Sequence, residues 1–165
     1  FLDIFLLANC SFCISTSGGL DNVSLIFNRP VLLVGVLPII DMQTYYKKVL
    51  LSTKQIYSNT LQRNLTLKEI FEEKLGEAYL TKEYQNKNVN IIELNSNQIT
   101  RLVIKMLDLI KHDFTLDESG ENNQENFKRK FSQLFSKNSK NEIYHTNFSA
   151  TFDPDFLEGN PEWLN

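Results

Sequence analysis

The sequence predicts an α/β fold, in which helices flank a parallel sheet. Three observations support this: a short apolar strand ends at a pair of glycines, a helical pattern follows them, and a second apolar strand runs from Pro30 to Val36. The second strand is rich in leucine and valine without polar alternation, which is typical of strands buried on both faces. A strand, a helix and a strand in this order form a βαβ unit, and such units build parallel sheets.

The composition fits one folded domain. The chain has 165 residues, of which 42% are hydrophobic and 22% are charged, so it can bury a sizeable core. Seventeen basic and twenty acidic residues give a net charge of −3, which argues against nucleic acid as a partner.

The chain begins without Met in apolar sequence that no basic region precedes, which argues against a signal peptide. The other apolar run, over residues 30–40, is too short to span a bilayer. We expect a cytoplasmic fragment, at most in peripheral contact with the inner face of the membrane, whose true start lies upstream.

The first half of the chain supplies the βαβ unit. We expect a helix that ends near residue 8 with Asn9 as its stop, a strand over 11–15 and a glycine turn over 16–19. A helix over 20–28 then ends before Arg29-Pro30 and the buried strand. Residues 37–65 give a poor signal and predict a long irregular connection, with one short strand over 50–56.

The second half adds helices. A capping box over residues 66–69 opens a helix that stops at Gly76, and a strand over 88–94 precedes a helix from Asn95 to about His112. Residues 117–125 are interpreted as a surface turn, 122–137 as a helix, and 144–165 as a docked tail. The side chains expected to face the core are Leu67, Ile70, Phe71, Leu75, Ile99, Leu102, Val103, Met106, Ile110, Phe127, Phe131, Leu134 and Phe135.

These elements give one domain in two parts. We expect residues 1–116 to form a ligand-binding α/β domain that is incomplete at its N-terminus, and residues 117–165 to form the last helix and the docked tail of the same domain.

The cysteines and histidines do not predict a metal site. Cys10 and Cys13 have C-x-x-C spacing, but they lead into a strand rather than a helix, and no second pair completes a zinc site. We interpret them as small buried hydrophobic residues in a reducing cytosol. His112 and His145 lie near no Cys or acidic cluster in the sequence.

The segment over residues 13–22 carries the candidate chemistry. Two glycines between a buried strand and a helix allow a sharp turn and the close approach of a ligand. The start of the helix presents unpaired N–H groups and a partial positive charge, which favour phosphate. The candidate phosphate contacts are Thr16, Ser17, Gly18, Gly19 and Leu20. Composition and spacing alone fit an ordinary turn with Ser17 as the helix N-cap at least as well.

The run over residues 17–20, followed by 29–32, resembles the donor-binding loop, helix and strand in the C-terminal domain of GT-B glycosyltransferases. More narrowly, it is similar to a bacterial glycosyltransferase family of surface-carbohydrate gene clusters, in which an F-x-I-x-T-x-S-G-L stretch precedes a proline-led strand and an N-x-x-P-type loop. Segments 65–70, 92–96 and 156–164 resemble later motifs of that family in the same order. The residues that match the first motifs are Phe12, Ile14, Thr16, Ser17, Gly18, Phe27, Arg29, Pro30, Val31, Leu32 and Pro38.

The resemblance implies a Rossmann-like domain, the C-terminal half of a GT-B architecture, whose N-terminal domain is missing here. It implies transfer of a sugar from a nucleotide-sugar donor to a surface-polysaccharide, glycan or lipid-linked acceptor, without a metal or other cofactor. The donor diphosphate would bind residues 16–20, with Asp21, Arg29 and Pro38 as candidate further donor contacts. The general base of such enzymes usually lies in the other domain, so no catalytic residue is assigned and this chain alone is expected to be inactive.

Two alternatives remain open. Non-hydrolysing UDP-N-acetylglucosamine 2-epimerases share the implied fold, but they carry S-G-G-x-Q-E-E where this chain has Asp21-Asn22-Val23, and the valine cannot replace the sugar-nucleotide contacts of the second glutamate. The second alternative is a non-catalytic module that binds a sugar nucleotide or a partner chain.

Glu69 and Glu77 have the E-x7-E spacing of retaining GT-B enzymes, but they lie in a different helix, where Glu69 belongs to the capping box. We therefore interpret this match as chance.

Overall fold

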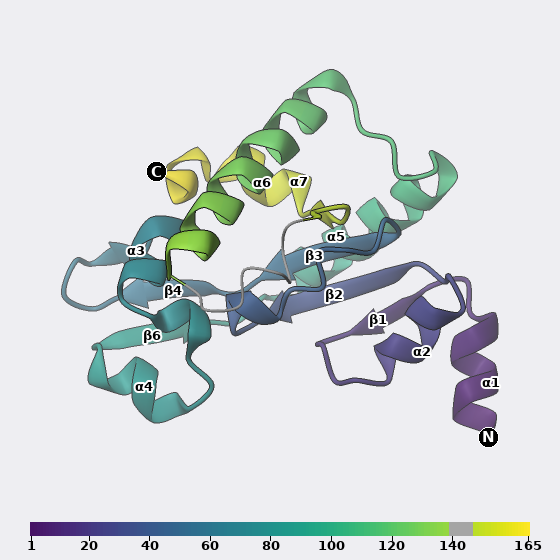
Figure 1. Ribbon diagram of the computed structural model, residues 1–165, viewed down its shortest axis with the longest axis horizontal. Coiled ribbons are helices and arrows are strands. Elements are labelled where there is room, and N and C mark those ends of the chain that lie inside the picture. The colour runs from purple at the N-terminus through teal and green to yellow at the C-terminus, as the bar shows by residue number, and fades with distance from the viewer. Residues whose placement is uncertain (139–146) are drawn as a thin grey trace.

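The computed structural model describes residues 1–138 and 147–165, with a parallel sheet at the centre (Figure 1). Within these residues the sheet has four strands in the order β1-β2-β3-β7: β1 (Cys13–Ser15), β2 (Val31–Val36), β3 (Val49–Thr53) and β7 (Thr151–Phe152). A smaller antiparallel sheet, in the order β5-β4-β6, contains β4 (Gln55–Ser58), β5 (Arg63–Asn64) and β6 (Val89–Ile92).

Helices cover both faces of the parallel sheet, which confirms the predicted α/β class (Figure 1). Val31 and Leu33 of β2 share one core with α2, α3 and α6, whereas Leu32 faces the other way and packs with α5. This alternation follows from the period of two along a strand. The helices are α1 (Leu2–Asn9), α2 (Asp21–Ile26), α3 (Leu67–Glu72), α4 (Thr81–Asn86), α5 (Ser96–Lys111), α6 (Glu118–Asn138) and α7 (Pro154–Gly159).

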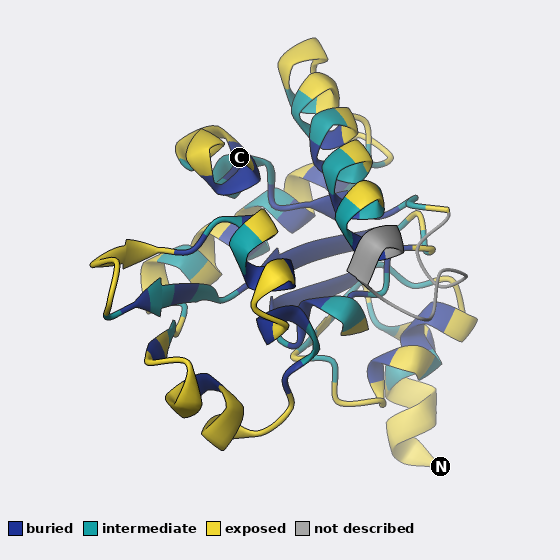
Figure 2. Ribbon diagram, turned by 60° about the vertical axis from the view of Figure 1, so that its left-hand side comes forward, coloured by how far each residue is buried: buried dark blue, intermediate teal, exposed yellow. Residues whose placement is uncertain are grey.

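The predicted βαβ unit is present. β1 and β2 pair in parallel, with Cys13 beside Val31 and Ser15 beside Leu33. Every residue of β2 is buried, as its continuous apolar run predicts (Figure 2).

The expectation of a long irregular connection over residues 37–65 is wrong. After a 3₁₀ turn (η1, Ile39–Asp41), β3 pairs in parallel with β2, and β4 and β5 form an antiparallel pair. The expected strand over 50–56 merges two strands that meet at Lys54. Only three apolar residues, Val49 to Leu51, mark β3 in the sequence, and this run is too short to stand out from a buried turn.

The capping box over residues 66–69 and the start of the helix at Asn95 are confirmed. Thr66 accepts a hydrogen bond from the Glu69 amide at 3.3 Å, while the Glu69 carboxylate accepts from the Thr66 amide at 2.9 Å. Asn95 accepts from the Gln98 amide at 3.0 Å and starts α5. The helix after Thr66 ends earlier than predicted, because a separate 3₁₀ turn (η2, Leu75–Glu77) contains Gly76.

The acidic stretch over residues 117–125, expected to be a surface turn, is instead the N-cap and the first two turns of α6. Asp117 accepts a hydrogen bond from the Gly120 amide at 2.8 Å and caps this helix. Glu118 and Glu121 then lie near the positive end of the helix, where carboxylates are favourable. The charge run therefore marks a helix start.

The inward face of α6 was predicted correctly. Phe127 and Phe131 are fully buried and Phe135 is nearly so, whereas Leu134 is partly buried. The rings of Phe127 and Phe152 have their centroids 4.3 Å apart. In α5, Leu102 and Met106 are buried as expected, but Leu109 is buried too and Ile99 is exposed, because the buried stripe lies closer to the C-terminal half of the helix.

The C-terminal tail contributes to the sheet. β7 pairs in parallel with β3, and Gln124 of α6 bonds both main-chain groups of Phe152, donating to its carbonyl at 2.7 Å and accepting from its amide at 2.9 Å. α7 and a final 3₁₀ turn (η4, Pro161–Leu164) follow. Residues 144–146 of the expected tail lie outside the described residues.

None of the helices in the described part of the chain combines the length and apolar character that crossing a membrane requires.

Candidate functional site

The glycine loop over residues 16–20 follows β1 at the carboxyl end of the parallel sheet, where ligands of such sheets bind. Ser17 has a φ of 67° and Gly19 a φ of 91°, so the chain reverses through two residues with positive φ. A Cβ added at Gly18 or Gly19 would meet no atom within 4 Å. The backbone of the loop is therefore free of steric cover at both glycines.

The end of the loop leaves main-chain donors unused. The amides of Asn22 and Val23 bond back to the carbonyls of Gly19 and Leu20, at 3.2 and 3.1 Å. Within residues 1–138 and 147–165, the amides of Gly19, Leu20 and Asp21 donate no hydrogen bond. Free N–H groups on consecutive residues can bind an anion.

Ser17 is not the N-cap of the following helix, so this part of the plain-turn interpretation is wrong. α2 begins at Asp21, its N-cap is Leu20, and no side chain caps it. The helix starts four residues after Ser17 because Ser17 and Gly19 have positive φ, which is incompatible with a right-handed helix. With only six residues, α2 has a weak dipole, so anion binding would depend on the free N–H groups.

Asp21 is a buried charged group at the start of α2. It is 1% exposed, and neither carboxylate oxygen has a hydrogen-bond partner in the described structure. Burial raises the pKa of the Cys13 thiol, and the charge of Asp21 adds to this effect. Burial also raises the pKa of Tyr45, with further contributions from Tyr46 and Asp21. Because both oxygens are shielded, the Asp21 side chain does not meet a ligand placed in the loop of this structure.

The structure does not bring Arg29 to the loop. Its Nε donates to the carbonyl of Ala8 at the end of α1, at 2.7 Å. The neighbouring Pro30 accepts from the Cys13 amide at the start of β1, so Arg29 lies at the amino edge of the sheet and the loop lies at the carboxyl edge. Pro38 is buried just after β2, at the same edge as the loop.

The thiols and histidines make ordinary contacts. Cys10 and Cys13 are free and partly buried, and the Cys10 thiol donates to the carbonyl of Leu7 at 3.2 Å. His112 follows α5, with its Nε2 3.6 Å from Asp108 Oδ1. His145 lies outside the described residues. Across residues 1–138 and 147–165, no three His, Cys, Asp or Glu side chains are grouped to hold a metal ion.

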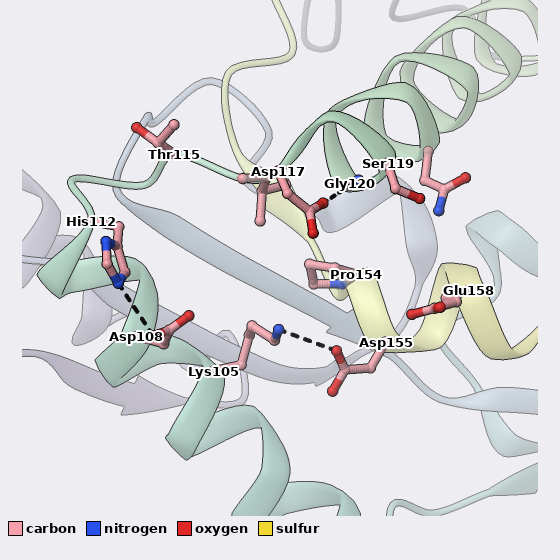
Figure 3. Close-up of a pocket in the computed structure, with 12 residues that line it drawn as sticks. Lys105, Asp108, His112, Thr115, Asp117, Ser119, Gly120, Pro154, Asp155 and Glu158 are labelled. Atoms are coloured by element: carbon pink, nitrogen blue, oxygen red, sulfur yellow. Dashed lines mark hydrogen bonds and ion pairs between the residues drawn. The ribbon is translucent and has the colours of Figure 1, made fainter.

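A separate polar cavity of about 530 Å³ lies between α5, the start of α6 and α7, and its lining includes no residue of the glycine loop (Figure 3). Asp155 in this cavity lies 3.4 Å from Lys105 Nζ. The other acidic side chains of its wall are Asp108, Asp117 and Glu158. This excess of carboxylates disfavours a diphosphate there.

Asp153, beside this cavity, was not singled out from the sequence. It caps α7 by accepting from the Phe156 amide at 3.3 Å, and it is buried. Burial raises the pKa of Asp153 to about 6. The sequence signal was Asp153-Pro154, an N-cap residue followed by a proline at the first helical position.

The fold and the loop define the class: an α/β protein with a Rossmann-like parallel sheet and an open glycine loop at its carboxyl edge. The chain matches no protein-family model, no curated protein and no solved structure.

Proposed function

We propose that this chain is the donor-binding part of a glycosyltransferase, which transfers a sugar from a nucleotide-sugar to a surface-polysaccharide or glycan acceptor. The observation that carries the proposal is the open loop over residues 16–20, with its free amides, at the carboxyl end of β1. The motif resemblance to GT-B glycosyltransferases supplies the reaction class. The acceptor, and a general base from another domain, complete the reaction.

The loop would act on the leaving group. When the glycosidic bond breaks, negative charge grows on the departing nucleoside diphosphate, and donors fixed around it stabilise the transition state more than the bound donor. The free amides of Gly19 and Leu20 would bind the phosphate oxygens, assisted by the hydroxyls of Thr16 and Ser17.

Isothermal titration with UDP, GDP and ADP tests the site. Gly18→Asp places a carboxylate in the loop, and the substitution should fold normally because Gly18 has no positive φ and a Cβ there meets nothing within 4 Å. We expect it to weaken binding by at least about tenfold, since the new charge repels the diphosphate.

Gly159→Asp is the matched control. Gly159 also has open space around its Cα and no positive φ, but it lies at the end of α7. The variant adds the same charge to the protein and should bind like the wild type. Equal binding by wild type and Gly18→Asp, or a loss confined to Gly159→Asp, would contradict the loop as the donor site.

Activity separates the enzyme from the alternatives. The protein extended at its N-terminus by its own coding sequence should transfer sugar to an acceptor. Binding without transfer by that longer protein indicates a non-catalytic module, and conversion of UDP-N-acetylglucosamine to its C2 epimer without any acceptor indicates an epimerase-like enzyme.

A further inference from the structure

The outer edge of β1 carries main-chain groups without partners. In the described residues β1 pairs with β2 alone. The Cys13 amide donates to the Pro30 carbonyl at 2.9 Å, so Cys13 points its polar groups at β2. Successive residues of a strand point to alternate sides, and the N–H and C=O of Ile14 therefore face away from β2. Outside the pairing of β1 with β2, the Ile14 amide donates no hydrogen bond in the described structure.

Apolar side chains around this edge are uncovered. Ile14 is 51% exposed, although its neighbour in the pair, Leu32, is completely buried under α5. α1 exposes more than half of Leu2, Phe5 and Leu6, and Figure 2 shows it exposed along most of its length. Apart from Asp3, α1 carries no charged residue, and helices that are apolar on all sides are normally buried.

The topology indicates what covers the outer edge of β1 and the exposed face of α1. α1 leads directly into β1 and packs against α2, where Ser24 Oγ donates to the Leu7 carbonyl at 3.1 Å. α2 is the crossover helix between β1 and β2. Crossovers between parallel strands are right-handed, so consecutive crossovers that advance in the same direction place their helices on the same face of the sheet. α1 therefore lies where the crossover from a strand outside β1 belongs.

We infer that the free edge of β1 is the docking site for one more β-strand, parallel to β1 and carried by the polypeptide that precedes Phe1. In this arrangement α1 is the crossover helix of a second βαβ unit. The Ile14 N–H and C=O complete the ladder with the new strand, and the strand covers the exposed side of Ile14. This inference is independent of the proposed function.

Two other occupants are disfavoured, a lipid surface by the charges and a second copy of this chain by the geometry of pairing. α1 contains no Lys or Arg, and the nearby Arg29 is bonded to Ala8, so the surface lacks the basic residues that attract anionic lipid. Two copies of β1 related by a two-fold axis would pair antiparallel through three residues each, and such a pair would not use the position of α1.

The test compares this chain with the protein extended by about 30 residues of its own upstream coding sequence, enough for a strand and a turn. We expect hydrogen exchange at the Ile14 amide to slow by roughly 100-fold in the longer protein, while exchange at Asn64, on the edge of the other sheet, stays the same.

A proline substitution checks the role of the amide. Ile14→Pro removes a donor that β2 does not use, so it should leave the thermal unfolding of the present chain unchanged and lower the unfolding midpoint of the longer protein. Ile14→Val keeps the donor and should match the wild type in both. Three results would overturn the inference: Ile14 exchanging equally fast in both proteins, a dimer of the present chain that protects Ile14, or binding of the longer protein through α1 to phosphatidylcholine–phosphatidylglycerol vesicles.

Discussion

Replacement of Asp153 by Asn should stabilise the protein at neutral pH and not in acid. Asp153 is 5% exposed at the start of α7, and its side chain accepts from the Phe156 amide. Burial raises its pKa to about 6, and the neighbouring charge of Asp155 adds to this, against the opposing effects of the amide bond and of Arg101. The folded protein therefore holds the proton of Asp153 more tightly than the unfolded chain does.

The size of the effect follows from the two pKa values. With about 3.9 in the unfolded chain and about 6 in the folded protein, ionisation of Asp153 lowers the free energy of unfolding by about 3 kcal/mol. The wild type has its full free energy of unfolding below about pH 4, where Asp153 is protonated, and loses about 3 kcal/mol of it as the pH rises through about 6. Asn also serves as an N-cap but cannot ionise. Asp153→Asn should thus equal the wild type near pH 4 and exceed it by about 3 kcal/mol above pH 7.

Urea unfolding followed by circular dichroism between pH 4 and pH 8 measures the difference directly. Glu125→Gln, which removes an exposed carboxylate of α6, is the control and should change little at any pH. A difference between Asp153→Asn and wild type that does not vary with pH, or a variant less stable than wild type at pH 7, would refute the reasoning.

Glu69→Gln should cost about 1 kcal/mol at pH 7, because the carboxylate that pairs with an arginine and caps its own helix is lost. The arginine hydrogen bond lowers the Glu69 pKa to about 2, so this cost should vanish as the pH falls from about 4 to 2, which urea unfolding across that range will show. Phe127→Ala should lower the free energy of unfolding by about 3–5 kcal/mol, since its ring is fully buried, whereas Phe27→Ala, at a half-exposed ring, should cost less than about 1 kcal/mol in the same assay. Gln124→Leu should cost about 3 kcal/mol in thermal unfolding, because the buried amide and carbonyl of Phe152 lose their partner.

The fold was predictable where sequence signals are long or chemically specific. The apolar run from Val31 to Val36, the Thr66 capping box and the phenylalanine spacing of α6 each have one good structural solution. β7 was not predicted because it has only two residues, Thr151 and Phe152. Their strand conformation depends on pairing with β3 and on the hydrogen bonds to Gln124. Such an element is defined by its tertiary partners.

The turn that carries the candidate site was predictable in position but not in detail. The glycine pair correctly located a tight turn at the end of β1. The two positive φ values and the late start of α2 at Asp21 could not be predicted, because serine rarely adopts such a conformation. Arg29 lies close to the loop in sequence, but one strand length separates the two in space, since a βαβ unit brings its second strand back to the opposite edge.

The central claim, that the glycine loop binds the diphosphate of a nucleotide donor, is tested most directly by NMR. A ¹⁵N-labelled sample titrated with UDP, GDP or ADP reports on each amide separately. The account predicts that, with a nucleotide that binds, the largest shifts occur at Gly19 and Leu20, while the amides around the cavity of Figure 3 stay unchanged. Saturable shifts centred on that cavity, with the loop amides unmoved, would contradict it.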